Sequence, residues 1–195
     1  MTHTDGFPIV AISSRAEWRN WLLDNHTNSK GVWLLSHKVA TGKPTITYEE
    51  GVLEALCFGW IDSKPNKFDD ERSLLYYSPR NPRSKWSALN KTRVTQLLQQ
   101  GLMMPEGQRM IDLAKETGTW NALDEVDALL IPADLQAALL ENPPAEANFL
   151  AFPKSTKRGI LEWILNAKRP ETRAKRITET ATLAAQNIRA NQFRP

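Results

Sequence analysis

The spacing of hydrophobic positions in the first part of the chain alternates between a helical period and an extended one. Ser14 and Glu17 have the spacing of a capping box, and the apolar residues that follow share one face, so a helix is expected that ends near Asn25. A run of β-forming residues at 31–38, closed by a Gly-Lys-Pro turn, predicts a buried strand. Helices and strands are therefore expected to alternate here.

The stretch 48–63 joins a short apolar helix directly to a second strand. Thr47 and Glu50 have the spacing of a capping box at the start of this helix. Gly59 supplies the left-handed residue that ends it, and the strand is expected over 60–64. We consider this junction the most site-like part of the sequence, because an acid, Asp62, follows it closely.

A tight turn is expected at 64–66, where a lysine, a proline and an asparagine follow one another. The residues 73–78 then predict a third strand, which Pro79 ends. Tyr76 and Tyr77 are adjacent on that strand, so one of them faces the core and the other faces the opposite side. Only the outward ring is placed to touch a ligand.

The rest of the chain has a helical pattern. Ser84 or Ser87 caps a helix that ends at Gly101, and Pro105 begins another helix that ends at Gly118. The acidic and weakly periodic segment that follows Gly118 is the best candidate for a linker, and four more helical segments follow it.

The predicted fold class is α+β: a small β-sheet of three or four strands with packed helices, followed by an all-helical C-terminal module. The predicted domains are residues 1–118 and 119–195, unless the two form one continuous globule. With 41% apolar and 24% charged residues, the chain has the composition of a globular protein rather than of a low-complexity one.

The first residues lack the basic and apolar regions of a signal peptide, and no apolar run approaches the roughly 20 residues that span a bilayer. We therefore expect a cytoplasmic protein without a membrane span. Cys57, the only cysteine, lies in an apolar run and is expected to be a buried, inert thiol. The three histidines share no metal-ligand spacing, so no metal site and no cofactor are expected.

The common catalytic signatures are missing from the sequence: it has no G-x-S-x-G elbow, no P-loop and no G-x-G-x-x-G. No catalytic residue is assigned on this basis, and whether the chain is an enzyme stays open. One alternative is an unrecognised enzyme in which Asp62 acts as acid or base, with burial beside Trp60 raising its pKa.

The candidate ligand site lies where the two strands of a 60–78 hairpin have their open ends. Pairing of these strands would bring Asp62 and Arg80 together with two indole rings, a mouth suited to a small polar or cationic ligand. The alternative is a salt bridge between Asp62 and Arg80 that has no role in binding. The candidate residues are Trp60, Asp62, Tyr77, Arg80, Ser84, Trp86 and Asn90.

The net charge of +3 is small, but basic and acidic residues fall in separate blocks. Residues 154–176 are strongly basic and 101–153 are acidic, so we favour pairing inside the molecule over nucleic-acid binding. A basic patch on a helix that begins at Pro170 is nevertheless a candidate site for phosphates or an acidic partner. Its residues are Lys168, Arg169, Arg173 and Arg176.

Three motifs resemble the YdeI/OmpD-associated family, whose members are also labelled bacteriocin-protection proteins. They are Glu54-Ala-Leu-Cys-Phe-Gly-Trp-Ile-Asp-Ser63, then Ser78-Pro-Arg80 with Ser84-Lys-Trp-Ser87, and finally Trp163 with Ala167-Lys-Arg-Pro-Glu-Thr-Arg173 and Arg176-Ile177. The resemblance implies a role in stress or in protection against antimicrobial peptides or bacteriocins, through binding of a small ligand or a protein partner. It carries no catalytic residues to this chain.

Overall fold

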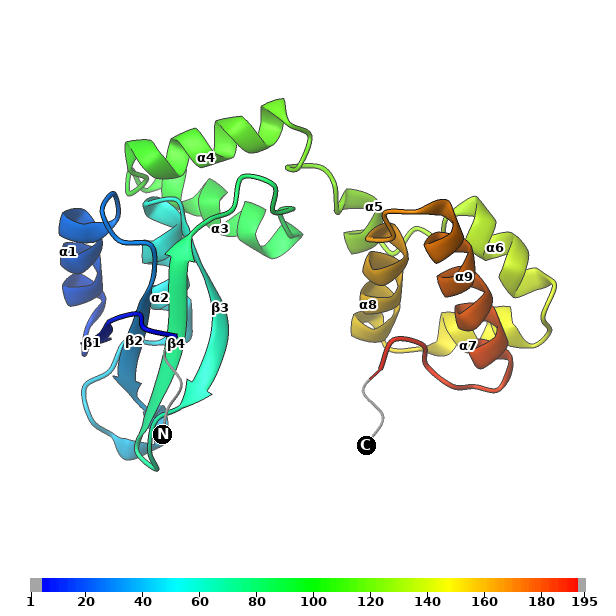
Figure 1. The fold of residues 1–195 in the computed structure, drawn as a ribbon, viewed down its shortest axis with the longest axis horizontal. Coiled ribbons are helices and arrows are strands. Elements are labelled where there is room, and N and C mark those ends of the chain that lie inside the picture. Colours follow the sequence, from blue (N-terminus) through cyan, green and yellow to red (C-terminus); the bar gives the residue numbers. More distant parts are fainter. Residues whose placement is uncertain (1–4, 193–195) are drawn as a thin grey trace. The chain divides into compact units, whose positions relative to one another are not determined.

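The computed structural model describes residues 5–192, which form two compact units that divide between Asn121 and Ala122. The first unit combines a sheet with helices and the second is helical, so the predicted α+β class is confirmed (Figure 1). The division lies close to the boundary expected at 118. The division into domains 1–118 and 119–195 stays a prediction.

Strands and helices alternate in the first half of the first unit, and helices complete it. In chain order the elements are β1 (Ile9–Ala11), α1 (Arg15–Asn25), β2 (Val32–His37), the 3₁₀ helix η1 (Val39–Thr41), α2 (Tyr48–Cys57), β3 (Trp60–Lys67), β4 (Arg72–Pro79), α3 (Ala88–Gln99) and α4 (Pro105–Glu116).

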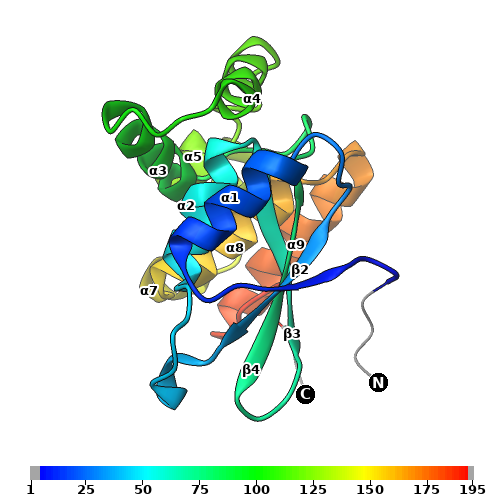
Figure 2. The ribbon, with the colours of Figure 1, turned by 90° about the vertical axis from the view of Figure 1, so that its left-hand side faces the viewer.

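The sheet has the strand order β1-β2-β4-β3, in which β1 is parallel to β2 and the other pairs are antiparallel. Helices α1 and α2 pack on one face of it, where their apolar residues share a core with residues of β2 and β4 (Figure 2). The strands expected at 31–38 and 73–78 are confirmed. Strand β1 was not predicted, because three residues are too few to show an alternating pattern.

The turn expected at 64–66 is wrong. Strand β3 runs on through Pro65 to Lys67, with a register shift between Asp62 and Pro65. A proline is tolerated there because β3 is an edge strand and carries a bulge. The chain turns after β3 instead, before β4 begins at Arg72.

The two adjacent tyrosines of β4 face opposite sides of the sheet, as expected. Tyr77 points into the helix-covered core, where its ring lies 5.0 Å from the ring of Trp18. Tyr76 packs on the other face, with ring centroids 5.2 Å from Trp33 and 5.1 Å from Phe7. Tyr77 is therefore the tyrosine that β4 directs toward α2.

Side-chain capping fixes the ends of the helices that carry the site. At α2 the reciprocal capping box between Thr47 and Glu50 is confirmed. At α1 only half of the expected box forms. Ser14 accepts a hydrogen bond from the Glu17 backbone, but the Glu17 carboxylate accepts from Ser13 instead of Ser14. Gly59 has a φ of 71° and ends α2 as predicted.

The second unit is helical and begins with a short helix inside the segment expected to be a linker. Its elements are α5 (Asp124–Asp127), α6 (Ala133–Leu140), α7 (Ala145–Ala151), α8 (Lys154–Leu165) and α9 (Pro170–Ala185). Val126 of α5 is buried in the core of this unit, so part of the expected linker packs as structure.

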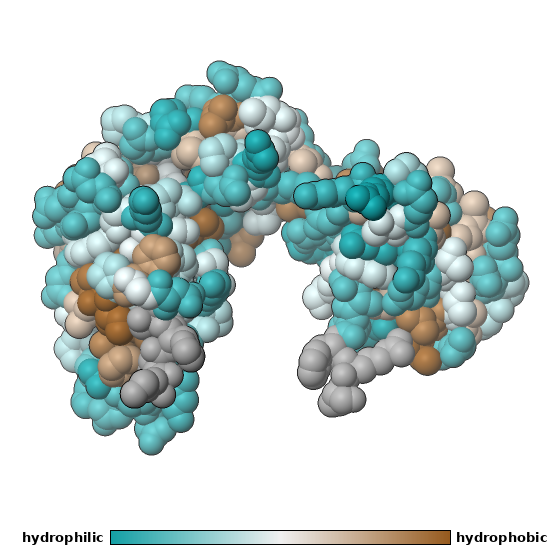
Figure 3. Space-filling model, viewed as in Figure 1, coloured by the Kyte–Doolittle hydropathy of each residue, from teal (hydrophilic) through white to brown (hydrophobic). Residues whose placement is uncertain are grey.

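The face of each unit in Figure 3 is mostly hydrophilic, with apolar residues in small groups. Among residues 5–192, no helix combines the length and the apolar character that crossing a bilayer requires.

Candidate functional site

The sheet register places Asp62 and Arg80 at different cavities. Strands β3 and β4 do pair as a hairpin, but Asp62 lies opposite Tyr77, whereas Arg80 follows the last paired residue and donates its backbone N–H to Gly59 at 2.8 Å. Within residues 5–192 neither side chain has an ion-pair partner. The expected shared mouth is therefore not formed, and neither is the alternative salt bridge.

Asp62 lines a cleft of about 730 Å³ on the helix-covered face of the sheet. We call it the Tyr48 cleft. It lies between the start of α2 and the strands β2, β3 and β4, and its polar and apolar groups come from all of these elements. Its lining includes Leu34, His37, Val39, Tyr48, Asp62, Leu75 and Tyr77.

A carboxylate and two phenol rings form one wall of the Tyr48 cleft. The hydroxyl of Tyr48 donates to Oδ2 of Asp62 at 3.0 Å. Burial, and then the charge of Asp62, raises the pKa of Tyr48, so its hydroxyl stays protonated and keeps donating at neutral pH. Tyr77 is buried beside them, and burial followed by the charge of Asp62 raises its pKa as well.

The nearest guanidinium is neutralised by a different acid. Arg93 pairs with Glu49, which accepts from Nε at 2.9 Å and also from Nη2, and it donates to Oδ1 of Asn90 at 2.8 Å. The hydrogen bond from Arg93 lowers the pKa of Glu49. Arg93 is thus held by Glu49 and acts on Asp62 only through its charge, and among residues 5–192 the Asp62 carboxylate has the Tyr48 hydroxyl as its hydrogen-bond partner.

His37 also lines the Tyr48 cleft, and its buried Nδ1 forms no hydrogen bond within residues 5–192. Two lysines also line the cleft, but both are engaged: Lys38 donates to the carbonyls of Asp69 and Asp70, and Lys67 pairs with the Asp70 carboxylate at 3.0 Å. In the described part of the chain, the cleft therefore contains one carboxylate without an ion pair and two lysines whose ammonium groups already have hydrogen-bond or ion-pair partners.

Arg80 lines a second cavity, of about 490 Å³, which we call the Arg80 cavity. Its guanidinium lies over the Trp86 ring at 4.0 Å and donates from Nη2 to the carbonyl of Lys85 at 2.7 Å. Burial lowers the pKa of Arg80 to about 10, which still leaves it charged at neutral pH. Trp60 also lines this cavity, and its indole N–H donates to the carbonyl of His26 at 3.2 Å.

Both cavities lie within residues that match a known family. Residues 10–110, more than half of the chain, match a family model described as a domain of unknown function, DUF8412. The chain belongs to the DUF8412 family. Residues 128–187 match a second model, described as Bacteriocin-protection, YdeI or OmpD-Associated. No curated protein and no solved structure gives a match.

The second match confirms the predicted resemblance for the helical unit, and its range contains the motif around Trp163 and Arg173. The two earlier motifs, at 54–63 and 78–87, lie instead within the DUF8412 domain. Because the Tyr48 cleft and the Arg80 cavity belong to that domain, the family description of the helical unit does not describe them.

Three of the predicted site residues line neither cavity of the DUF8412 domain. Ser84 lies in a turn, where its backbone N–H donates to Asn81, and Ser87 rather than Ser84 caps α3. The Trp86 ring packs 5.2 Å from a second indole, Trp120, as well as under Arg80. Asn90 is held by Arg93, as described above. These three residues therefore do not line either of the two cavities.

Sequence reasoning missed Tyr48 and His37. Tyr48 is 57% exposed in the first turn of α2, and the buried residues of this helix begin only at Gly51. His37 was considered only as a metal ligand. No local pattern pairs residue 48 with residue 62, so the contact emerges only from the packing of α2 against β3.

The predicted basic patch is divided by contacts inside the helical unit. Arg173 donates from Nε to Asp134 at 2.7 Å, which lowers the pKa of that acid. Arg176 lies 4.9 Å from the Trp163 ring and donates to its carbonyl. Pairing of this basic block with the acidic block is the alternative that the charge pattern favoured. The exposed members of the patch are Lys168 and Arg169.

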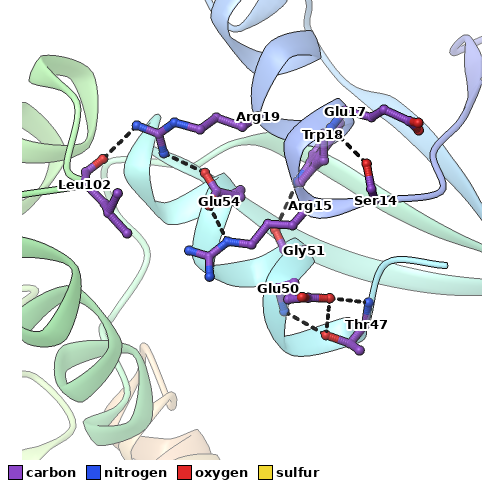
Figure 4. A network of polar contacts seen from close by, with 10 residues as sticks. All are labelled: Ser14, Arg15, Glu17, Trp18, Arg19, Thr47, Glu50, Gly51, Glu54 and Leu102. Carbon is purple, nitrogen blue, oxygen red and sulfur yellow. Dashed lines mark hydrogen bonds and ion pairs between the residues drawn. The ribbon is translucent and has the colours of Figure 1, made fainter. Parts of the chain in front are cut away.

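A buried ionic network joins α1 to α2 in the DUF8412 domain (Figure 4). Glu54 is 2% exposed and accepts from Nε of Arg15 and from Nη1 of Arg19, each at 2.6 Å. Cys57 lies one turn further along α2, and burial raises the pKa of its thiol to about 11. This thiol is therefore protonated at neutral pH, in agreement with the expectation of an inert cysteine.

Proposed function

We propose that the DUF8412 domain is a binding module that holds a small molecule with a cationic group in the Tyr48 cleft. The observation that carries the proposal is the Asp62 carboxylate, which lies half-buried in the wall of a cleft of about 730 Å³ without an ion-pair partner among residues 5–192. A carboxylate that leaves water is stabilised by an opposite charge, and a ligand cation would supply that charge.

The rings beside Asp62 favour an ammonium group over a metal ion. Tyr48 and Tyr77 flank the carboxylate, and aromatic faces attract organic cations. A metal ion would require several oxygen or nitrogen ligands, and no group of three or more suitable side chains occurs in the described part of the chain.

The apolar walls suit a ligand with a hydrocarbon part. Leu34 and Leu75 lie in the cleft, and Val39 and Tyr48 at its rim are 77% and 57% exposed. Covering these side chains would contribute about 25 cal/mol for each Å² of apolar surface removed from water. A cleft of this volume falls in the range of sites that hold small organic molecules.

The helical unit supports a protective role as the context of this binding. Asp62 is the reason that the proposed ligand is cationic, and the bacteriocin-protection description of the helical unit supports a role in which the cell sequesters or senses that ligand. We propose that this takes place in the cytoplasm and that the chain acts by binding.

A titration with matched ligands tests the proposal. Isothermal titration with phenethylamine, and with phenethyl alcohol as its neutral analogue, separates the contribution of charge from that of the apolar part. We expect saturable binding of the amine, at least about tenfold weaker binding of the alcohol, and weaker amine binding at high salt. An amine that binds no better than the alcohol contradicts the proposal.

Two variants locate the binding site. Asp62→Asn removes the charge but keeps the shape, so amine affinity should fall about tenfold or more. Asp24→Asn is the matched control, because Asp24 is exposed on α1 of the same unit and lines neither cavity. The control should bind the amine like the unmodified protein. Equal loss in both variants would show a general charge effect instead of a site.

A further inference from the structure

The Arg80 cavity contains a buried cation without an ion-pair partner in the described residues, whereas the Tyr48 cleft contains the Asp62 carboxylate. Arg80 is 6% exposed and has no ion-pair partner among residues 5–192. Its partners are one carbonyl and one indole ring, and its Nε is buried without a hydrogen bond. A full positive charge is thus held inside the domain by neutral groups.

Such an arrangement is costly unless a negative charge is supplied. Removing a guanidinium from water loses its hydration, and one carbonyl oxygen and a ring face replace only part of it. The direction of the Arg80 pKa agrees with this, since burial alone lowers it. The folded domain therefore contains a cation that a bound anion would stabilise.

The rest of the cavity wall does not neutralise Arg80. Glu106 and Arg109 both line the cavity, but they pair with each other at 2.7 Å. His26 also lines it, and its Nδ1 lies 2.8 Å from the carbonyl of Leu22, so this nitrogen carries the proton and donates. With one acid against two guanidiniums, the wall carries a net positive charge.

The apolar part of the wall indicates what kind of anion fits. Phe58, Trp60 and Met110 line the cavity and are otherwise buried. An aromatic or aliphatic body can pack against them while an oxyanion reaches Arg80. A guanidinium presents several N–H donors in one plane, which suits the paired oxygens of a carboxylate or phosphate.

We propose that the Arg80 cavity binds a small organic anion through its carboxylate or phosphate group, with Arg80 as the charge partner. This site is separate from the Tyr48 cleft, takes a ligand of opposite charge and does not depend on the function proposed above. The two cavities share no lining residue.

Benzoate, phenyl phosphate and benzyl alcohol form a matched set of probes for this site. At constant ionic strength set with chloride, we expect benzoate or phenyl phosphate to bind saturably and to raise Tm, and benzyl alcohol to do neither. The stronger of the two anions identifies the preferred oxyanion. Failure of both anions to saturate, or equal binding of benzyl alcohol, overturns the proposal.

Variants of two neighbouring arginines assign the binding to Arg80. Arg80→Met removes the charge and keeps much of the volume, so anion affinity should fall about tenfold or more. Arg83→Met is the matched control, since Arg83 is exposed in the same loop and lines neither cavity. Unchanged affinity in Arg80→Met, or an equal loss in Arg83→Met, overturns the proposal.

A third variant keeps the test valid if Arg80→Met does not fold. Arg80→Lys retains the charge but loses the planar group that lies over Trp86, so we expect a folded domain with several-fold weaker anion binding. Unchanged affinity in this variant rules out recognition by the guanidinium. Asp62→Asn should bind the anion normally, which separates failure of this site from failure of the Tyr48 cleft.

Discussion

Arg19 donates to the Glu54 carboxylate at 2.6 Å and so connects α1 to α2 inside the DUF8412 domain. Arg15 reaches the other oxygen of the same carboxylate at the same distance. A single buried acid is thus neutralised by two arginines of one helix, and neither α1 nor α2 can leave the sheet without breaking these pairs (Figure 4).

The first prediction concerns this network. Glu54→Gln keeps the side-chain shape but leaves the two arginines without their acid, so the free energy of unfolding should fall by about 3 kcal/mol. Urea denaturation measures it. Glu17→Gln is the control, because Glu17 bonds only to the exposed start of α1 and should cost less than about 1 kcal/mol. Equal effects of the two substitutions would contradict the assigned role.

The second prediction compares two helical glycines. A Cβ on Gly107 would lie 2.3 Å from the carbonyl oxygen of Cys57 and 2.7 Å from that of Leu56, so α4 must shift. Gly107→Ala should destabilise the first unit by about 3 kcal/mol. Gly159 has open space around its Cα, and Gly159→Ala should stabilise the second unit by about 0.5–1 kcal/mol. Thermal unfolding should show a lower Tm for Gly107→Ala and a higher Tm for Gly159→Ala.

The third prediction uses the pKa of the Cys57 thiol, which burial raises to about 11. At pH 8.5 an unfolded thiol is about half ionised, whereas the native one is almost fully protonated. Iodoacetamide should therefore modify the native protein about 100-fold more slowly than the urea-unfolded protein. Because the unfolded state loses its proton first, stability should decline as pH rises from about 8.5 toward 11. Rapid labelling of the native protein would contradict a buried thiol.

The fourth prediction concerns Asp134 and Arg173 in the helical unit. The hydrogen bond from Arg173 lowers the pKa of Asp134 below 3.8, so the pair stabilises the fold above that pH and loses its effect as pH falls through the lower, folded value. Arg173→Gln should lower the free energy of unfolding by up to about 1 kcal/mol at pH 7, a small loss because both groups are partly exposed. At a pH where Asp134 is protonated, the same substitution should not change the free energy of unfolding.

A matched arginine controls for general charge effects on the helical unit. Arg169 precedes α9 and is exposed, so Arg169→Gln should leave the free energy of unfolding nearly unchanged at both pH values. A pH-dependent loss of the same size in this variant would show that overall charge, and not the pair with Asp134, sets the stability.

Local sequence signals were sufficient to predict those features that depend on contacts between residues close together in the chain. Thr47 with Glu50, Gly59, and Pro105 at the start of α4 each determine a helix end through contacts within a few residues. These features could be predicted. Pro65 could not be placed correctly, because its effect depends on whether its strand lies at the edge of the sheet.

The candidate site was only partly predictable, because it depends on contacts between distant segments. The candidates Asp62 and Tyr77 line the same cleft, but Tyr77 is the core-facing tyrosine and not the outward one that was expected to touch a ligand. The separation of Asp62 from Arg80 follows from the strand register, which the hydrophobic pattern leaves open. Tyr48 belongs to the site because the start of α2 extends past the core. The position of Tyr48 depends on both the length and the packing of α2, and no sequence motif indicates it.

The outer edge of β3 has a consequence for self-association. A bulge follows Asp62, Pro65 offers no backbone N–H, and Lys64 and Lys67 add charge along the same strand. A strand from a second molecule would meet an interrupted ladder and two cations, which disfavours edge-to-edge aggregation. Pairing of two molecules through their β3 edges should accordingly be disfavoured.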